Sequence, residues 1–192
     1  MTRAGWLAGL LVLLSAAALA DGTFPSGLKP ADRERLQSFD EVRAATIAAA
    51  RAGGAAADRA VLDRVLEGEA AALPPGGMAG NWRCRTLKLG GKPVLVVYAE
   101  FRCRITDDAA GLRLEKLTGS QRTSGTLYDL GEARLGYAGA EAWGADEAPR
   151  RYGQDPARDQ VGYLVPVSQG RMRLELPLPR QESRFDILAL QR

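Results

Sequence analysis

The spacing of apolar residues along this chain changes once, from a helical to an alternating period. Residues 29–54, "KPADRERLQSFDEVRAATIAAARAGG", repeat apolar positions at helical intervals, with Pro30 in the first turn and Gly53-Gly54 at the end. A second helix is predicted over about residues 55–66. The run Pro74-Pro75-Gly76-Gly77 interrupts both patterns and marks a boundary.

From Gly80 onwards, apolar and polar residues alternate as they do in half-buried strands. About eight or nine short strands with turn residues between them are typical of an antiparallel barrel or sandwich. They include "NWRCRTLKL", "EFRCRIT", "TSGTLYDL", "EARLGYAGAEAW", "QVGYLVPV", "RMRLELPL" and "SRFDILAL". The sequence therefore predicts an α+β fold, with an N-terminal helical pair packed on a mostly antiparallel β-barrel and a β-sandwich as the alternative.

The first twenty residues, "MTRAGWLAGLLVLLSAAALA", have the pattern of a secretory signal peptide. Arg3 precedes an apolar stretch, and Ala18-Leu19-Ala20 fits a cleavage site, although an uncleaved membrane anchor is the alternative. We expect three segments: 1–20 as signal peptide, 21–78 as helical segment and linker, and 79–192 as β domain. The mature protein is then periplasmic or secreted, with no transmembrane segment left after cleavage.

The only two cysteines, Cys84 and Cys103, each lie between two arginines. In an exported protein, two cysteines predict a disulfide, and two ligands alone do not make a closed zinc site. Alternation places the cysteines on the same face as Trp82 and Phe101, which makes these aromatic residues candidates for lining the barrel.

The register between these two strands limits the predicted disulfide. A two-residue turn at Gly90-Gly91 would leave the cysteines about 20 Å apart along the strands, too far to bond. The disulfide requires residues near Lys88 to face those near Ala99. The connection must then be wide or bent, and Pro93 suits a bend.

Alternation sends the arginines beside the cysteines to the opposite face, where like charges need an offset. Glu115 or another acid, solvent, or a bound anion could provide this offset, so these arginines are candidate anion-binding residues. The polar segments 116–128 and 148–162 add three more candidates, or else form surface loops. The full candidate set is Arg83, Arg85, Arg102, Arg104, Arg122, Arg150 and Arg151.

The chain contains no histidine, which excludes Ser-His-Asp and Cys-His catalysis and histidine metal sites within it. Asp155 and Asp159 are too few acids to predict a calcium site. A net charge of +3 is too small to indicate nucleic-acid binding. We therefore predict no catalytic residues, no metal and no cofactor, and favour a protein that is not an enzyme.

Two resemblances add to this interpretation. Gly80-Asn81-Trp82 resembles the Gly-x-Trp entry of lipocalin and calycin barrels, which implies that the tryptophan closes one end beneath an arginine, here Arg184 or Arg192. Longer stretches resemble an exported bacterial family catalogued as domain of unknown function 4893, which implies export and a shared fold but no activity. They are "NWRCRTLKLGG", "EFRCRITDD", "RLEKLTGSQRTSGTLY", "APRRYGQDPARDQVGY" and "PLPRQESRFDILAL".

Three functions fit these patterns. The leading hypothesis is a non-catalytic binding module, for a small ligand inside the barrel or for an anionic component of the cell envelope. The second is an envelope protein that acts on a protein partner, as an assembly factor or inhibitor. The third is a hydrolase, which requires two carboxylates to converge in one cleft. For this role, alternation leaves Glu115, Glu175 and Asp186 facing outward or ambiguous.

Overall fold

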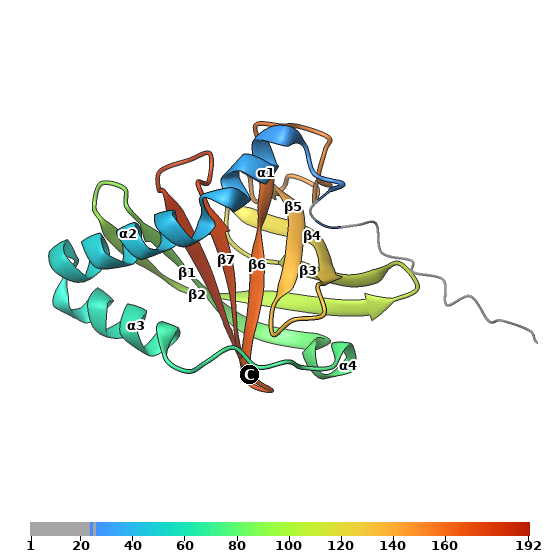
Figure 1. Cartoon of the computed structure of the whole chain (residues 1–192), viewed down its shortest axis with the longest axis horizontal. Helices are drawn as coiled ribbons and strands as arrows, with labels where there is room; N and C mark the ends of the chain where they lie inside the picture. The colour runs from blue at the N-terminus through green and yellow to red at the C-terminus, as the bar shows by residue number, and fades with distance from the viewer. Residues whose placement is uncertain (1–23, 25) are drawn as a thin grey trace, which may run out of the picture.

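The computed structural model describes residue 24 and residues 26–192, so the expected signal peptide over residues 1–20 lies outside the described residues. Four helices precede eight strands (Figure 1). The helices are α1 (Pro30–Gln37), α2 (Phe39–Gly53), α3 (Ala56–Leu66) and α4 (Pro75–Met78). The strands are β1 (Gly80–Leu89), β2 (Leu95–Asp108), β3 (Gly111–Lys116), β4 (Arg122–Asp129), β5 (Leu135–Ala142), β6 (Asp159–Ser168), β7 (Arg171–Pro177) and β8 (Phe185–Gln191).

The strands form a closed antiparallel barrel in which each strand pairs with the next along the chain. Pairing of β1 with β8, from Arg83 opposite Gln191 to Leu89 opposite Phe185, closes the sheet. Closure removes the free edges that an open sheet presents. The predicted antiparallel barrel is confirmed, and the alternative sandwich is not the fold.

The predicted first helix is two helices, because the chain turns at Ser38 between α1 and α2. The Ser38 hydroxyl donates to the backbone carbonyls of Glu34 and Arg35. The predicted linker also contains one helical turn, α4. Apolar periodicity continues across this turn, so it does not predict the break between α1 and α2.

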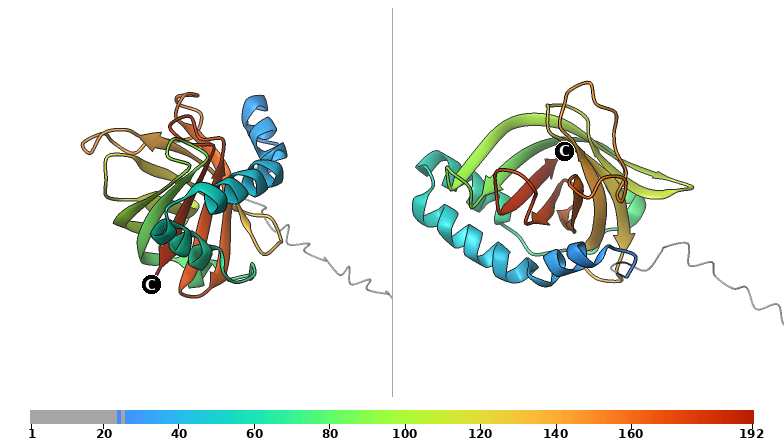
Figure 2. Two further views of the ribbon diagram at one scale, coloured as in Figure 1. Left: turned by 90° about the vertical axis from the view of Figure 1, so that its left-hand side faces the viewer. Right: turned by 90° about the horizontal axis from the view of Figure 1, so that it is seen from above.

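Helices α2 and α3 lie along one side of the barrel (Figure 2). They cover an apolar outer face of β1 and β8 that includes Leu87, Phe185 and Ile187, all fully buried. A buried polar contact joins α2 to β7: Arg43 and Arg173 both bind the Glu175 carboxylate, at 2.6 and 2.9 Å. None of the helices in the described residues has the length and apolar character needed to cross a bilayer.

The barrel interior has a second apolar cluster, which includes Trp82, Ile105, Leu135 and Met172. At the end of the barrel where β1 begins, the Trp82 indole donates to the Met78 carbonyl of α4 at 3.0 Å. The Arg192 guanidinium stacks over the Trp82 ring, 4.1 Å from its centroid. Trp82, α4 and Arg192 together close this end, which we call the closed end.

Cys84 and Cys103 form a disulfide inside the barrel, as predicted. The register differs from the expected one, because Cys84 faces Phe101 and Cys103 faces Trp82. The sulfur atoms therefore join diagonal neighbours, whose Cα atoms are 5.9 Å apart. A register shift between Arg85 and Leu87 and a wide connection, Gly90–Val94, replace the tight turn. The expected pairing of Lys88 near Ala99 is therefore wrong: Lys88 faces Val96.

We expect the Cys84→Ala/Cys103→Ala variant to be about 3 kcal/mol less stable to unfolding, since the disulfide closes a loop between residues 19 positions apart. Urea unfolding with and without reductant measures this difference. The reductant should lower the stability of the wild type and leave the double variant unchanged. Equal sensitivity in both proteins would contradict the prediction.

Candidate ligand site at the mouth of the barrel

The side chains that face into the barrel change from apolar to polar towards the end opposite Trp82, which we call the mouth. Four charged residues come from the mouth ends of four strands: Lys88 of β1, Lys116 of β3, Glu141 of β5 and Asp186 of β8. Each is at most 8% exposed. Buried charges are rare unless they are paired, so this group marks a candidate functional site.

A cavity of about 470 Å³ opens at the mouth, beside the β3–β4 and β7–β8 loops. Its lining residues are Thr86, Lys88, Tyr98, Phe101, Lys116, Gly119, Ser120, Gln121 and Glu182. A deeper chamber of about 40 Å³ adds Glu141, Gln160 and Asp186 to Lys88 and Lys116. We call these two spaces the mouth cavity and the inner chamber.

The two lysines have different partners. The Lys88 ammonium donates to Glu182 at 2.6 Å and to the Gln121 amide oxygen at 2.7 Å. Burial lowers the pKa of Lys88, but the Glu182 hydrogen bond and nearby carboxylates outweigh burial and raise this pKa overall. Lys88 therefore stays charged in the cavity wall.

The Lys116 ammonium donates to the Gln121 carbonyl at 2.7 Å and lies 3.9 Å from the centre of the Phe101 ring. Within the described residues, Lys116 forms no ion pair with a carboxylate. Burial, followed by the charge of Lys88, lowers the pKa of Lys116 to about 8. The cavity thus holds a buried cation that no acidic side chain neutralises directly.

The two carboxylates of the inner chamber accept hydrogen bonds from neutral groups. Asp186 accepts from the Ser183 hydroxyl at 2.6 Å, and Glu141 accepts from the Gln160 amide and the Trp143 indole at 2.7 and 2.8 Å. Burial raises the pKa of Asp186 to about 7, against the opposing effects of Ser183 and Lys88. Asp186 is therefore partly protonated at neutral pH.

Beneath the carboxylates, a chain of hydrogen bonds runs across the barrel. The Thr123 hydroxyl donates to the Gln160 side-chain oxygen and also contacts the Tyr137 hydroxyl at 2.7 Å. Full burial raises the pKa of Tyr137, so it remains a neutral phenol. This chain fixes the orientation of Gln160, which in turn holds Glu141.

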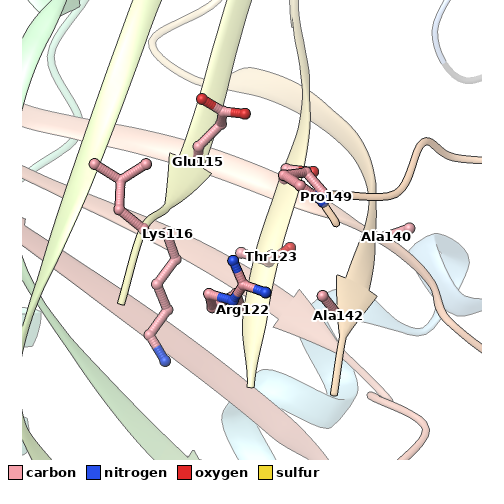
Figure 3. A pocket seen from close by; sticks show the side chains of 9 residues that line it. Glu115, Lys116, Arg122, Thr123, Ala140, Ala142 and Pro149 are labelled. Atoms are coloured by element: carbon pink, nitrogen blue, oxygen red, sulfur yellow. The ribbon is translucent and has the colours of Figure 1, made fainter. Parts of the chain in front are cut away.

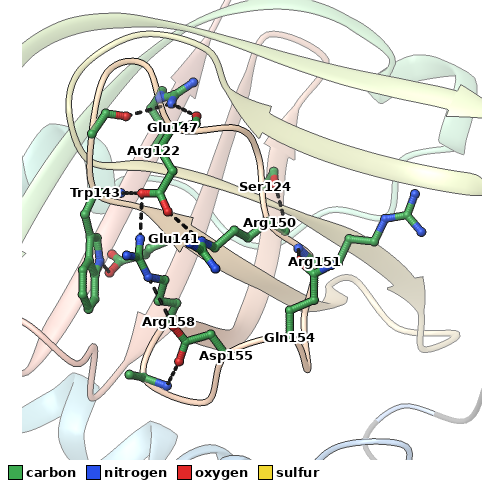
Figure 4. A network of polar contacts seen from close by, with 12 residues as sticks. Arg122, Ser124, Glu141, Trp143, Glu147, Arg150, Arg151, Gln154, Asp155 and Arg158 are labelled. Carbon is green, nitrogen blue, oxygen red and sulfur yellow. Dashed lines mark hydrogen bonds and ion pairs between the residues drawn. The ribbon is translucent and has the colours of Figure 1, made fainter.

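The β5–β6 loop, residues 143–158, borders the mouth and is held by Glu147 (Figure 4). The Glu147 carboxylate accepts from the Trp143 backbone amide, Arg150 and Arg158, each at 2.7 Å. These bonds lower the pKa of Glu147 to about 2, the backbone bond having the largest effect. Arg122 of β4 donates to the Gly144 and Glu147 carbonyls, which ties the loop to the barrel.

A smaller pocket of about 60 Å³ lies in the barrel wall between β3 and β4 (Figure 3). Pairing of these strands covers only three residues on each side, Arg113–Glu115 with 124–126. Figure 3 shows Glu115 and Lys116 pointing in opposite directions, as neighbours on a strand do. Lys116 lines both the wall pocket and the mouth cavity.

The two aromatic residues predicted to line the barrel lie in different places. Phe101 lines the mouth cavity. Trp82 faces the interior but lies at the closed end, under Arg192. Of the two arginines considered for covering Trp82, Arg192 occupies that position, whereas Arg184 bonds to Leu89 and Leu178 through its backbone at the mouth end.

The predicted anion-binding arginines do not form one cluster. On the outer face of β1 and β2, Arg85 lies 3.5 Å from Glu100, and Arg104 lies 3.3 Å from Glu115, while Arg83 faces Arg102 across the pair. Three others belong to the mouth: Arg122 and Arg150 bind within the loop network, and the Arg151 guanidinium points away from it in Figure 4. Acidic side chains thus neutralise some, but not all, of the arginines on the outer face of β1 and β2.

Sequence reasoning missed the charged residues of the inner chamber. Lys88 has the same parity as Trp82 and Cys84, and Asp186 has the same parity as Leu188 and Leu190, so both occur where alternation expects apolar residues. Asp186 points into the barrel, and Glu175 is buried under α2 instead of facing solvent. A charged residue at a position that alternation directs into the barrel was the sequence feature that could have indicated this site.

Comparison with protein families places this geometry in a known group. The model of the family "Domain of unknown function (DUF4893)" matches residues 26–190. The chain belongs to this family. The match covers all four helices and almost the whole barrel, including every residue of the mouth cavity. Neither the curated proteins nor the solved structures provide a match.

We expect Asp186→Asn to stabilise the protein at pH 8 more than at pH 5. The raised pKa means that the folded state keeps the proton that the unfolded state loses near pH 4, so wild-type stability falls as the pH rises towards about 7. The full loss of wild-type stability is on the order of 4 kcal/mol. Asparagine does not titrate and so avoids this loss, while its side-chain oxygen can still accept the hydrogen bond from the Ser183 hydroxyl. Urea unfolding at both pH values measures the difference.

The exposed Asp63 provides a matched control, since Asp63→Asn changes the same charge outside the barrel. Its effect on stability should be similar at the two pH values. A gain from Asp186→Asn that is equal at pH 5 and pH 8 would contradict the raised pKa.

Proposed function

We propose that this protein is a non-catalytic binding module that holds a small ligand with an anionic head group in the mouth cavity. The observation that carries the proposal is the buried Lys116 ammonium, which lines a cavity of about 470 Å³ without an ion-pair partner among the described residues. Cavities of roughly 300–1,000 Å³ are typical of small-molecule sites. A ligand carboxylate, sulfonate or phosphate group would supply the missing counter-charge.

The rest of the cavity favours an apolar or aromatic ligand body. Phe101 and Tyr98 form one wall, and Tyr98 is 38% exposed. In the part of the chain that the structure describes, the three large apolar side chains that are exposed are Tyr98, Leu117 and Trp143, which all lie at the mouth. Exposed apolar groups beside a polar cavity are typical of binding sites.

Two further features support an exported, lipocalin-like binding protein. The disulfide is typical of periplasmic and secreted proteins, in agreement with the expected signal peptide and with an envelope location. The Trp82–Arg192 stack agrees with the closed end that the Gly-x-Trp resemblance implies. A barrel closed at one end and polar at the other suits ligand binding.

A hydrolase is the second candidate, because Glu141 and Asp186 are two buried carboxylates that line one chamber. In such a reaction, Glu141 takes a proton from water and the water oxygen bonds to the substrate carbon. The bond between that carbon and the leaving group breaks, and Asp186 protonates the leaving group. The hypothesis of a protein partner has less support, since closure leaves no free sheet edge on the described barrel.

We expect Lys116→Met to weaken binding of an anionic aromatic probe, anilinonaphthalene sulfonate, at least tenfold. Methionine keeps the length and apolar contacts of the stem but removes the charge that pairs with the sulfonate. Fluorescence titration measures the dissociation constant. The control, Lys92→Met, removes an exposed lysine that lies outside the cavity lining and should bind like the wild type.

Equal binding by Lys116→Met and wild type would contradict the proposed site. Native mass spectrometry of the protein purified from its own periplasm identifies a natural ligand as a reproducible added mass. A mass that is lost in Lys116→Met supports the binding module. Consumption of that molecule over time, abolished in Glu141→Gln, would instead support the hydrolase.

We expect affinity for the same probe to fall as the pH rises from 6 to 9. Asp186 gains a negative charge as the pH passes about 7, and Lys116 loses its positive charge as the pH passes about 8, so both changes disfavour an anion. Titrations at several pH values measure this trend. The uncharged analogue phenylnaphthylamine should bind with little pH dependence, and an equal trend for both probes would count against a head group beside Lys116.

A further inference from the structure

A groove lies outside the barrel, between α3 and the neighbouring strands. Figure 1 shows where α3 runs along the barrel. One part, of about 160 Å³, is lined by Val61, Arg64, Val65, Arg83, Arg85 and Glu100, among others. The adjoining part, of about 250 Å³, contains Arg171 and Arg173. Both parts share Arg64, Val65, Ala189 and Gln191, so the groove is continuous.

Two of these arginines hold α3 in place. Arg171 donates to the Arg64 and Glu67 carbonyls at 2.9 and 3.0 Å, which satisfies carbonyls at the C-terminal end of α3. Arg173 donates to the Val65 carbonyl at 3.3 Å and pairs with Glu175. Their hydrogen-bonding groups are therefore engaged with the protein itself.

The Arg64 and Arg83 guanidinium groups are free of such roles. Both residues are exposed, and neither forms an ion pair within the described residues. Arg85 contributes a third guanidinium, held only at 3.5 Å from Glu100. The part of the groove between α3 and β1 thus contains three arginines and one acid.

The sheet adds an energetic reason for an anion here. Arg83 of β1 and Arg102 of β2 face each other in the register, and Arg102 also has no ion-pair partner among the described residues. Like charges directly opposite each other destabilise a sheet. An anion beside Arg83 would offset that repulsion.

We propose that this groove is a second anion-binding site, in which Arg64 and Arg83 bind a phosphate group carried by a larger molecule. Two guanidinium forks from different elements match the several oxygens of a phosphate. A volume of about 160 Å³ admits the phosphate but not a large ligand, so the remainder of the molecule extends along the groove over Val65 and Ala189. The site is separate from the mouth cavity, and its occupant is a soluble phosphate ester or a lipid head group.

The test follows the arginine Nε–H signals by nuclear magnetic resonance during titration with inorganic phosphate. The Arg64 and Arg83 signals should shift and saturate together at millimolar phosphate, and Arg64→Gln/Arg83→Gln should show at least a tenfold weaker response at Arg85. Both residues are exposed, so the variant should unfold at nearly the wild-type temperature. Linear, unsaturated shifts shared by all exposed arginines would overturn the proposal.

The control variant, Arg151→Gln/Arg180→Gln, loses the same charge from exposed positions outside the groove and should retain saturable phosphate binding. Co-sedimentation with vesicles of phosphatidylcholine and phosphatidylglycerol distinguishes the two sources. Sedimentation that is lost only in Arg64→Gln/Arg83→Gln supports a lipid head group. Saturable phosphate binding without sedimentation supports a soluble ester, and loss of binding in both variants alike would reject the site.

Discussion

The pairing of β1 with β8 is the constraint on which the rest of this structure depends. Once these strands pair, every strand has one face inside the barrel and one face outside, and each residue's parity fixes its environment. The outer faces of β1 and β8 are apolar at Leu87 and Ile187, so they require the cover that α2 and α3 provide. The helices are therefore a consequence of a barrel with apolar residues on both sides of its wall.

The interior is divided along its axis. Apolar side chains fill the closed end around Trp82, whereas Lys88, Lys116, Glu141 and Asp186 occupy the inner chamber at the other end. Lys88 has an ion-pair partner in Glu182, but Lys116 and Asp186 have none among the described residues. Burying a charge without such a partner is costly, and an apolar filling of similar volume would generally be no less stable. The polar end thus lowers stability in a place where a cavity also opens, and this combination is typical of functional sites.

The sequence predicts much of this fold and little of the site. Alternation correctly placed Cys84 and Trp82 on one face. The presence of two cysteines in a chain expected to be exported predicted the disulfide. The register needed the shift beside Arg85 and the wide connection after Leu89, which depend on tertiary packing instead of local pattern. The break between α1 and α2 at Ser38 does not interrupt the apolar periodicity, so the pattern did not reveal it.

The site was harder to predict because its residues are distant in the sequence. The positions of Lys88 and Asp186 each violate the apolar pattern of their strands, but one such violation does not reveal a partner. They become neighbours in the register only when β1 pairs with β8, where Lys88 faces Asp186. The two residues come together only in the closed sheet, and the spacing of apolar residues along the chain does not show which strands are neighbours.

The stack of Arg192 on Trp82 at the closed end has a consequence for access to the barrel interior. With Trp82 and Arg192 across one end, the cavity of the described barrel opens at the other end, the mouth. A molecule that occupied the mouth cavity would enter and leave through the same opening, beside the β5–β6 loop that Glu147 holds. The rate at which such a molecule is released would then depend on the residues around this single opening.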